Sequence, residues 1–60
     1  MKLREDKEIR LEFKHTCLLC LEPLEPGPVV YITWIGPVGG IGYFHVGLCA
    51  EAMRRIIEES

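Results

Sequence analysis

The sequence predicts a small α+β domain in which strands come first and one helix comes last. From Glu8 to Lys14, apolar and charged residues alternate, which is the period of a strand with one buried face. Val29–Ile35 is β-branched or aromatic throughout, a composition that favours a strand. From Val46 to Glu59, apolar residues recur at helical spacing. Together these three patterns predict the class.

A charged stretch precedes the first strand. We expect residues 1–7 to form a flexible lead-in, so that the domain spans residues 8–60. The run Leu3–Phe13 is also rich in helix formers, but its apolar residues lack helical spacing, and we therefore favour the strand. The buried face of that strand is predicted to carry Ile9, Leu11 and Phe13.

The middle of the chain predicts a β-hairpin. Residues 21–28 hold three prolines and one glycine, which excludes a helix and predicts an irregular connection. Gly36–Gly40 has the composition of a turn, so Ile41–Phe44 can return antiparallel to Val29–Ile35. In the helix that follows, the predicted apolar stripe consists of Cys49, Ala52, Met53 and Ile56.

The short length and the three cysteines predict stabilisation by a metal ion. A core built from 60 residues rarely suffices alone. Three cysteines cannot all pair within one chain, and the N-terminus lacks the apolar segment of a signal peptide. We therefore expect a cytoplasmic protein whose thiols bind metal. No apolar run approaches the roughly 18 residues that span a bilayer, so we expect no membrane association.

Four potential ligands have the spacing Cys-x2-Cys-x24-His-x3-Cys. Zinc prefers four tetrahedral nitrogen and sulfur ligands. A Cys-x-x-Cys turn can direct two thiolates to one ion, and residues four apart at the start of a helix share a face. The helix N-terminus also favours the negative charge of thiolates. The spacing predicts one structural zinc ion per chain, held by Cys17, Cys20, His45 and Cys49.

Other roles for these side chains remain open at this point. Cys49 lies on the apolar stripe and could be a buried thiol, and another metal or an iron–sulfur centre could use the same ligands. A redox Cys-x-x-Cys pair would need a thioredoxin-like βαβ frame, for which the chain has no room. His15, two residues before Cys17, could replace His45. We favour His45 because His15 lies at a strand end without a helical partner.

The knuckle Cys17-Leu18-Leu19-Cys20 and the helix opening Tyr43-Phe44-His45-Val46-Gly47-Leu48-Cys49 resemble those of treble-clef zinc fingers. The resemblance covers roughly Phe13 to Glu59 and includes the proline-containing loop that leads to Gly27. One departure is that three residues separate His45 from Cys49, where many treble clefs have two. The resemblance implies a structural zinc ion in a group that binds nucleic acids or proteins and, rarely, catalyses reactions. It does not indicate a subfamily.

The ligand set argues against an enzyme. A catalytic zinc ion keeps an open coordination position, whereas four protein ligands would close the site. Gly47 stands where zinc deaminases place their glutamate, two residues after the histidine. The chain also lacks a Ser/His/Asp set and a phosphate-binding loop. We therefore expect a binding module without a small-molecule substrate.

We expect this module to bind a protein partner or a second copy of itself. One helix can cover only one side of the hairpin sheet, which leaves apolar residues for contact. Leu21 and Leu24 could instead fold over that side. The alternative is a regulatory nucleic-acid-binding zinc finger, but seven Lys and Arg interleaved with nine Asp and Glu form no strong basic field. The predicted contact residues are Tyr31, Trp34 and Ile35.

Overall fold

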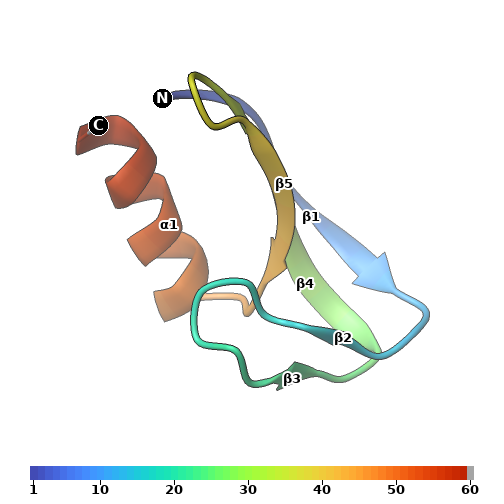
Figure 1. Ribbon diagram of the computed structural model, residues 1–60. Helices are drawn as coiled ribbons and strands as arrows, with labels where there is room; N and C mark the ends of the chain where they lie inside the picture. Colours follow the sequence, from blue (N-terminus) through green and yellow to red (C-terminus); the bar gives the residue numbers. More distant parts are fainter. Residues whose placement is uncertain (60) are drawn as a thin grey trace.

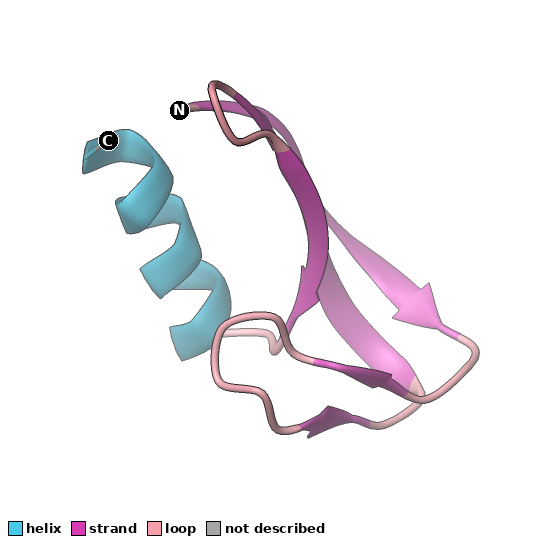
Figure 2. Ribbon diagram, in the orientation of Figure 1, coloured by secondary structure: helices cyan, strands magenta, loops and turns pink. Residues whose placement is uncertain are grey.

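The computed structural model describes residues 1–59, which form two antiparallel sheets and one helix (Figure 1). The larger sheet contains β1 (Lys2–Leu11), β4 (Gly27–Ile35) and β5 (Gly40–Phe44), with β4 in the centre. Helix α1 (Leu48–Glu59) follows β5 and lies along one side of this sheet (Figure 2). The predicted α+β class and the hairpin of β4 and β5 are confirmed. Within residues 1–59, no helix has the length and apolar character needed to cross a bilayer.

Strand β1 differs from the prediction at both ends. Residues 2–7, expected as a flexible lead-in, belong to this strand and pair antiparallel with β4, with Asp6 opposite Ile32. The strand ends at Leu11, so Phe13 lies beyond it with 73% of its surface exposed. The pairing partner explains both differences. β4 is nine residues long and offers backbone N–H and C=O groups along its whole length. These groups form hydrogen bonds with the backbone of the charged stretch, whatever side chains that stretch carries.

The larger sheet has a face beneath α1 and a face on the opposite side. Val30 and Ile32 point toward α1 and are buried there with Phe44. Asp6 lies on the same side, where its carboxylate accepts two hydrogen bonds from Arg54 of the helix. We call the opposite side the outer face. Its exposed and partly exposed residues are Lys2, Glu5, Lys7 and Ile9 of β1, Tyr31, Thr33 and Ile35 of β4, and Ile41 and Tyr43 of β5, and the buried Leu11 and Val29 lie on the same side.

The buried side of α1 is rotated from the predicted stripe. Ala50, Met53 and Ile57 are buried, whereas Ile56, at the end of the predicted stripe, is 44% exposed. The first turn of the helix directs Cys49 toward a cluster of metal-binding side chains. The side that meets the core therefore lies one residue, or about 100°, further round the helix.

The proline-rich segment takes part in a second, smaller sheet. β2 (His15–Thr16) pairs with β3 (Pro23–Leu24) where the sequence predicts an irregular connection. Leu24 is buried and belongs to the same core as Val29, which lies on the outer side of β4. Leu21 is exposed. Of the two leucines that could have covered the outer side, Leu24 is thus part of the core and Leu21 faces solvent.

Candidate metal centre

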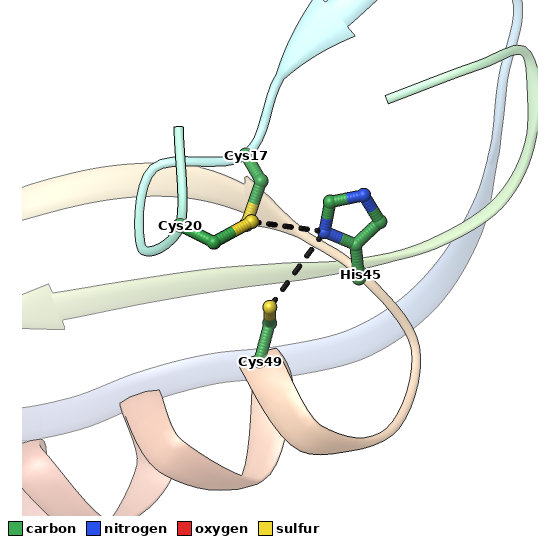
Figure 3. Close-up of side chains that lie close together, drawn as sticks. All are labelled: Cys17, Cys20, His45 and Cys49. Atoms are coloured by element: carbon green, nitrogen blue, oxygen red, sulfur yellow. Dashed lines mark hydrogen bonds between the residues drawn. The ribbon is translucent and has the colours of Figure 1, made fainter. Parts of the chain in front are cut away.

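Three parts of the fold bring four metal-binding side chains together (Figure 3). Cys17 and Cys20 lie in the chain reversal between β2 and β3, His45 follows β5, and Cys49 lies in the first turn of α1. One ligand atom of each residue lies within 4.8 Å of every other. These are the four residues whose spacing predicts a shared metal ion.

Backbone hydrogen bonds shape the reversal that carries the two N-terminal cysteines. The N–H of Cys17 donates to the carbonyl of Glu22 at 2.9 Å, and the N–H of Leu21 donates to the carbonyl of Cys17 at 3.0 Å. Leu21 has a φ of 64°, a left-handed conformation that turns the chain back directly after Cys20. The reversal therefore holds both thiols on one side of a tight loop.

Two further features place the other ligands beside this loop. The N–H of Leu18 donates to the carbonyl of Tyr43 at 3.3 Å, which fixes the loop against β5 just before His45. Gly47 has a φ of 98°, a value that glycine adopts readily, and the chain turns there from the strand into α1. The N–H of Ala50 then donates to the carbonyl of His45 at 3.2 Å, so the helix begins directly beside the histidine.

Two of the six separations between the donor atoms equal the edges of a tetrahedral site. Nδ1 of His45 lies 3.5 Å from Sγ of Cys20 and 3.6 Å from Sγ of Cys49, as the dashed lines in Figure 3 indicate. In a tetrahedron with Zn–S of about 2.3 Å and Zn–N of about 2.05 Å, the sulfur–nitrogen edge is about 3.6 Å. The observed separations therefore match those of ligands that share one ion.

The second ring nitrogen of His45 supports its role as a ligand. Nε2 lies 3.3 Å from the carbonyl oxygen of Pro23. A carbonyl oxygen can only accept a hydrogen bond, so this contact places the ring proton on Nε2. The lone pair of Nδ1 then faces the sulfur atoms. Such a hydrogen bond from the outer nitrogen to a backbone carbonyl is typical of metal-binding histidines.

The thiols have opposite shifts in pKa. Burial raises the pKa of Cys17, but backbone hydrogen bonds from Cys20, His45 and Leu19 outweigh it and lower the pKa to about 6. Burial, together with the nearby sulfurs of Cys20 and Cys17, raises the pKa of Cys49 to about 11. Several thiolates this close repel one another unless a cation balances their charge. Three sulfurs and one imidazole therefore suit a single bound metal ion.

His15, the competing histidine in the sequence, lies outside this cluster. It belongs to β2, and its ring packs against Tyr43 with centroids 5.0 Å apart and a tilt of 41°. The histidine that shares the cluster in the structure is His45.

The three residues predicted to contact a partner do not share one surface. Tyr31 and Ile35 lie on the outer face, whereas Trp34 points to the side of α1 and packs against the core. Its Nε1–H donates to the carbonyl of Val38 at 3.1 Å. A Cβ atom on Gly40 would lie 2.4 Å from the Trp34 ring, so the glycine leaves room for the indole. Trp34 therefore packs over the hairpin instead of extending the outer face.

Sequence reasoning missed two neighbours of Tyr31. The ring of Tyr43 lies 5.5 Å from that of Tyr31 with a tilt of 44°, and Nζ of Lys7 lies 5.5 Å from the Tyr31 centroid. The alternation of side chains along a strand can assign each of these residues to one face of its own strand. Only the pairing register shows that all three share one row across the sheet.

The chain is thus a small α+β domain with a cluster of three cysteines and one histidine positioned to hold one metal ion. Comparisons with protein-family models, with curated proteins and with solved structures found no match to this chain. Its function is therefore inferred from the geometry and chemistry described above.

Proposed function

We propose that this chain is a structural-zinc module, without enzymatic activity, whose outer face contacts a protein. The metal assignment rests on the four clustered donor atoms, two of whose separations equal tetrahedral edges. Three sulfurs and one imidazole nitrogen favour zinc over the hard cations, which prefer oxygen. Four donors complete the tetrahedron and leave no position for a substrate. The order of knuckle, hairpin and helix supports a treble-clef arrangement.

Exposed apolar side chains on the outer face support a role in protein contact. Ile35 is 48% exposed and Ile41 is also exposed, and both lie on the side of the sheet opposite α1. Tyr31 and Tyr43 lie beside them and are partly exposed. Apolar patches of this kind on small proteins mark interaction sites, and tyrosine is enriched among the residues that anchor them.

Nucleic-acid binding, the alternative, has less support from the charges. Phosphate binding depends on available lysine and arginine side chains. Three of the seven in this chain, all within the described residues, are engaged by carboxylates. These pairs are Lys7 with Glu5, Lys14 with Glu25, and Arg54 with Asp6. The outer face carries two lysines, Lys2 and Lys7, and Lys7 is paired with Glu5.

A matched pair of isoleucine variants tests the contact. We expect zinc-loaded protein to self-associate in sedimentation equilibrium at sub-millimolar concentration, and Ile35→Glu to weaken this by at least about tenfold because a charge would be buried. Ile56→Glu is the control, since Ile56 has similar exposure but lies on the helix. If the wild type is monomeric, the same variants are compared for their ability to capture a partner protein from native lysate. We then expect only Ile35→Glu to lose this ability. Equal behaviour of the two variants in both assays contradicts the proposal.

A further inference from the structure

The outer face contains an open pocket in which a lysine of the chain lies against a tyrosine ring. The pocket has a volume of about 320 Å³ and is lined by Glu5, Lys7, Ile9, Tyr31 and Tyr43. Its walls are therefore two phenol rings and one aliphatic side chain, and its only charges are one carboxylate and one ammonium group. None of these residues takes part in the metal centre.

The position of Lys7 shows which chemistry the pocket accommodates. Its ammonium group lies 5.5 Å from the centroid of Tyr31 and 3.5 Å from a carboxylate oxygen of Glu5. The second ring, Tyr43, lies 5.5 Å from Tyr31 at a tilt of 44°, so the two rings form an open V. Aromatic faces together with a carboxylate recognise ammonium and quaternary ammonium groups.

We propose that this pocket binds an alkylammonium group of a protein partner, a lysine or methylated lysine side chain, and that in the free protein Lys7, at the wall of the pocket, competes for Tyr31 and Glu5. This inference rests on the proposed role of the outer face in protein contact. The contact of Lys7 with Tyr31 and Glu5 is easily broken, because the Lys7 side chain is 57% exposed and exposed ion pairs are weak. An incoming ammonium group can therefore displace it into solvent.

Charge complementarity favours a cation over the other possible occupants. When Lys7 leaves, Glu5 remains as the only charged group among the residues that line the pocket, and the site becomes negative. A phosphate or a nucleotide would then meet repulsion, whereas an ammonium group would replace the charge that Lys7 supplied. The ring of His15 packs against Tyr43 and so supports one of the two aromatic walls.

Titration of the zinc-loaded protein with tetramethylammonium chloride tests the pocket directly. The readout is the ring NMR signals of Tyr31 and Tyr43, with sodium chloride at equal ionic strength as the reference. We expect saturable shifts that Lys7→Met makes about two- to fivefold tighter, because the competing contact is worth about that factor. Glu5→Gln should weaken binding. Lys14→Met is the matched control, since Lys14 is similarly exposed and also pairs with a carboxylate, that of Glu25 at 3.7 Å, but does not line the pocket.

The outcomes separate the possible ligands. Nα-acetyl-lysine amide, which keeps its side-chain ammonium group, and its Nε-trimethylated form are compared in the same titration. The comparison shows which alkylammonium group binds more tightly. Absence of saturable shifts in both the wild type and Lys7→Met overturns the proposal, as does equal affinity for Lys7→Met and Lys14→Met. Shifts caused by adenosine monophosphate but not by tetramethylammonium would instead indicate stacking of a base. A preserved amide spectrum verifies that each variant is folded.

The same experiment separates this inference from the proposed function. Ile35→Glu should weaken protein contact by at least about tenfold yet leave tetramethylammonium binding within about twofold, because Ile35 does not line the pocket. If the protein still self-associates but does not bind tetramethylammonium, the outer face keeps its proposed role in protein contact. Only the proposal of an ammonium site is then contradicted.

Discussion

At one end of the molecule the loop between β2 and β3, the end of β5 and the start of α1 converge on four ligand atoms. At the other end, the hairpin turn and the N-terminus lie beside the last turns of α1 (Figure 1). We call the first the metal end, defined by Cys17, Cys20, His45 and Cys49. The second is the turn end, defined by Met1, Trp34, Gly40 and Ile57. The structure of the metal end depends on where four donor atoms point, whereas the structure of the turn end depends on how apolar side chains pack against one another.

Trp34 shows how the turn end is built. Its ring lies over Gly40, its Nε1–H bonds to the carbonyl of Val38, and it packs against the buried core. Each such contact contributes modestly, and the core of a 60-residue chain supplies only about 3–5 kcal/mol in total. A structural zinc ion contributes about 10–16 kcal/mol in finger peptides. We therefore expect the turn end to depend on the metal end for its stability.

Removal of the metal should have the largest effect and should unfold both ends. We expect a chelator, added under reducing conditions, to abolish cooperative folding, because the remaining core cannot replace the energy of coordination. Trp34 is the only tryptophan and lies at the turn end, so its fluorescence reports on that end specifically. Elemental analysis should give one zinc per chain before chelation. Unchanged Trp34 emission in the metal-free protein would show that the turn end folds independently.

Substitution of a single ligand should have the same effect as chelation, and the two histidines provide a matched pair. His45→Ala should release zinc and abolish cooperative unfolding, since it opens the tetrahedron. His15→Ala should retain zinc and lose only the contact with Tyr43, at a cost of about 0.5–1.5 kcal/mol. Zinc content and thermal unfolding measure both variants. Zinc release from His15→Ala but not from His45→Ala would reverse the ligand assignment.

A smaller effect is expected at the turn end from two neighbouring isoleucines. Ile57→Ala should destabilise the zinc-saturated protein by about 2–4 kcal/mol because the side chain is buried. Ile56→Ala should change the stability by no more than about 0.5–1 kcal/mol, since its side chain is largely outside the core. Both substitutions change helix propensity equally, so urea unfolding isolates the effect of burial. Equal losses would contradict the observed orientation of α1.

These isoleucines also show why the helix could be predicted but its buried side could not. Ile56 and Ile57 are both apolar, and Met53 belongs to either stripe, so spacing alone permits two neighbouring faces. The choice depends on how the first turn must aim Cys49, which is a property of the assembled site. The hairpin raises no such ambiguity, because its turn composition and its flanking strands agree.

The cluster of three cysteines and one histidine was the most predictable part of the molecule, because few residue types can serve as metal donors. Cysteine and histidine are scarce in this chain, and the spacing of four of them leaves few ways to complete a tetrahedron. Strand β1 lies at the opposite extreme. The residues from Lys2 to Lys7 are mostly charged and carry no strand pattern, and their pairing follows from the backbone edge that β4 offers. That edge exists only in the folded molecule.

The smallest effect is expected between the two ends, where β1 meets α1. Arg54 donates to both carboxylate oxygens of Asp6, one of the bonds measuring 2.9 Å, and the Asp6 side chain is only 19% exposed. Hydrogen bonding to this carboxylate raises the pKa of Arg54 against the opposing effect of burial, so the guanidinium remains charged. Asp6→Asn leaves that charge without its bidentate partner.

We expect Asp6→Asn to cost about 1 kcal/mol in urea unfolding of the zinc-saturated protein, less than a fully buried pair would, because Arg54 is partly solvated. Glu8→Gln is the matched control, since Glu8 lies two residues further along β1 on the same side and is exposed. Zinc content should be unchanged in both variants. Loss of zinc from Asp6→Asn would mean that this ion pair positions the helix for Cys49. In that case the two ends would be coupled through β1 as well as through the metal.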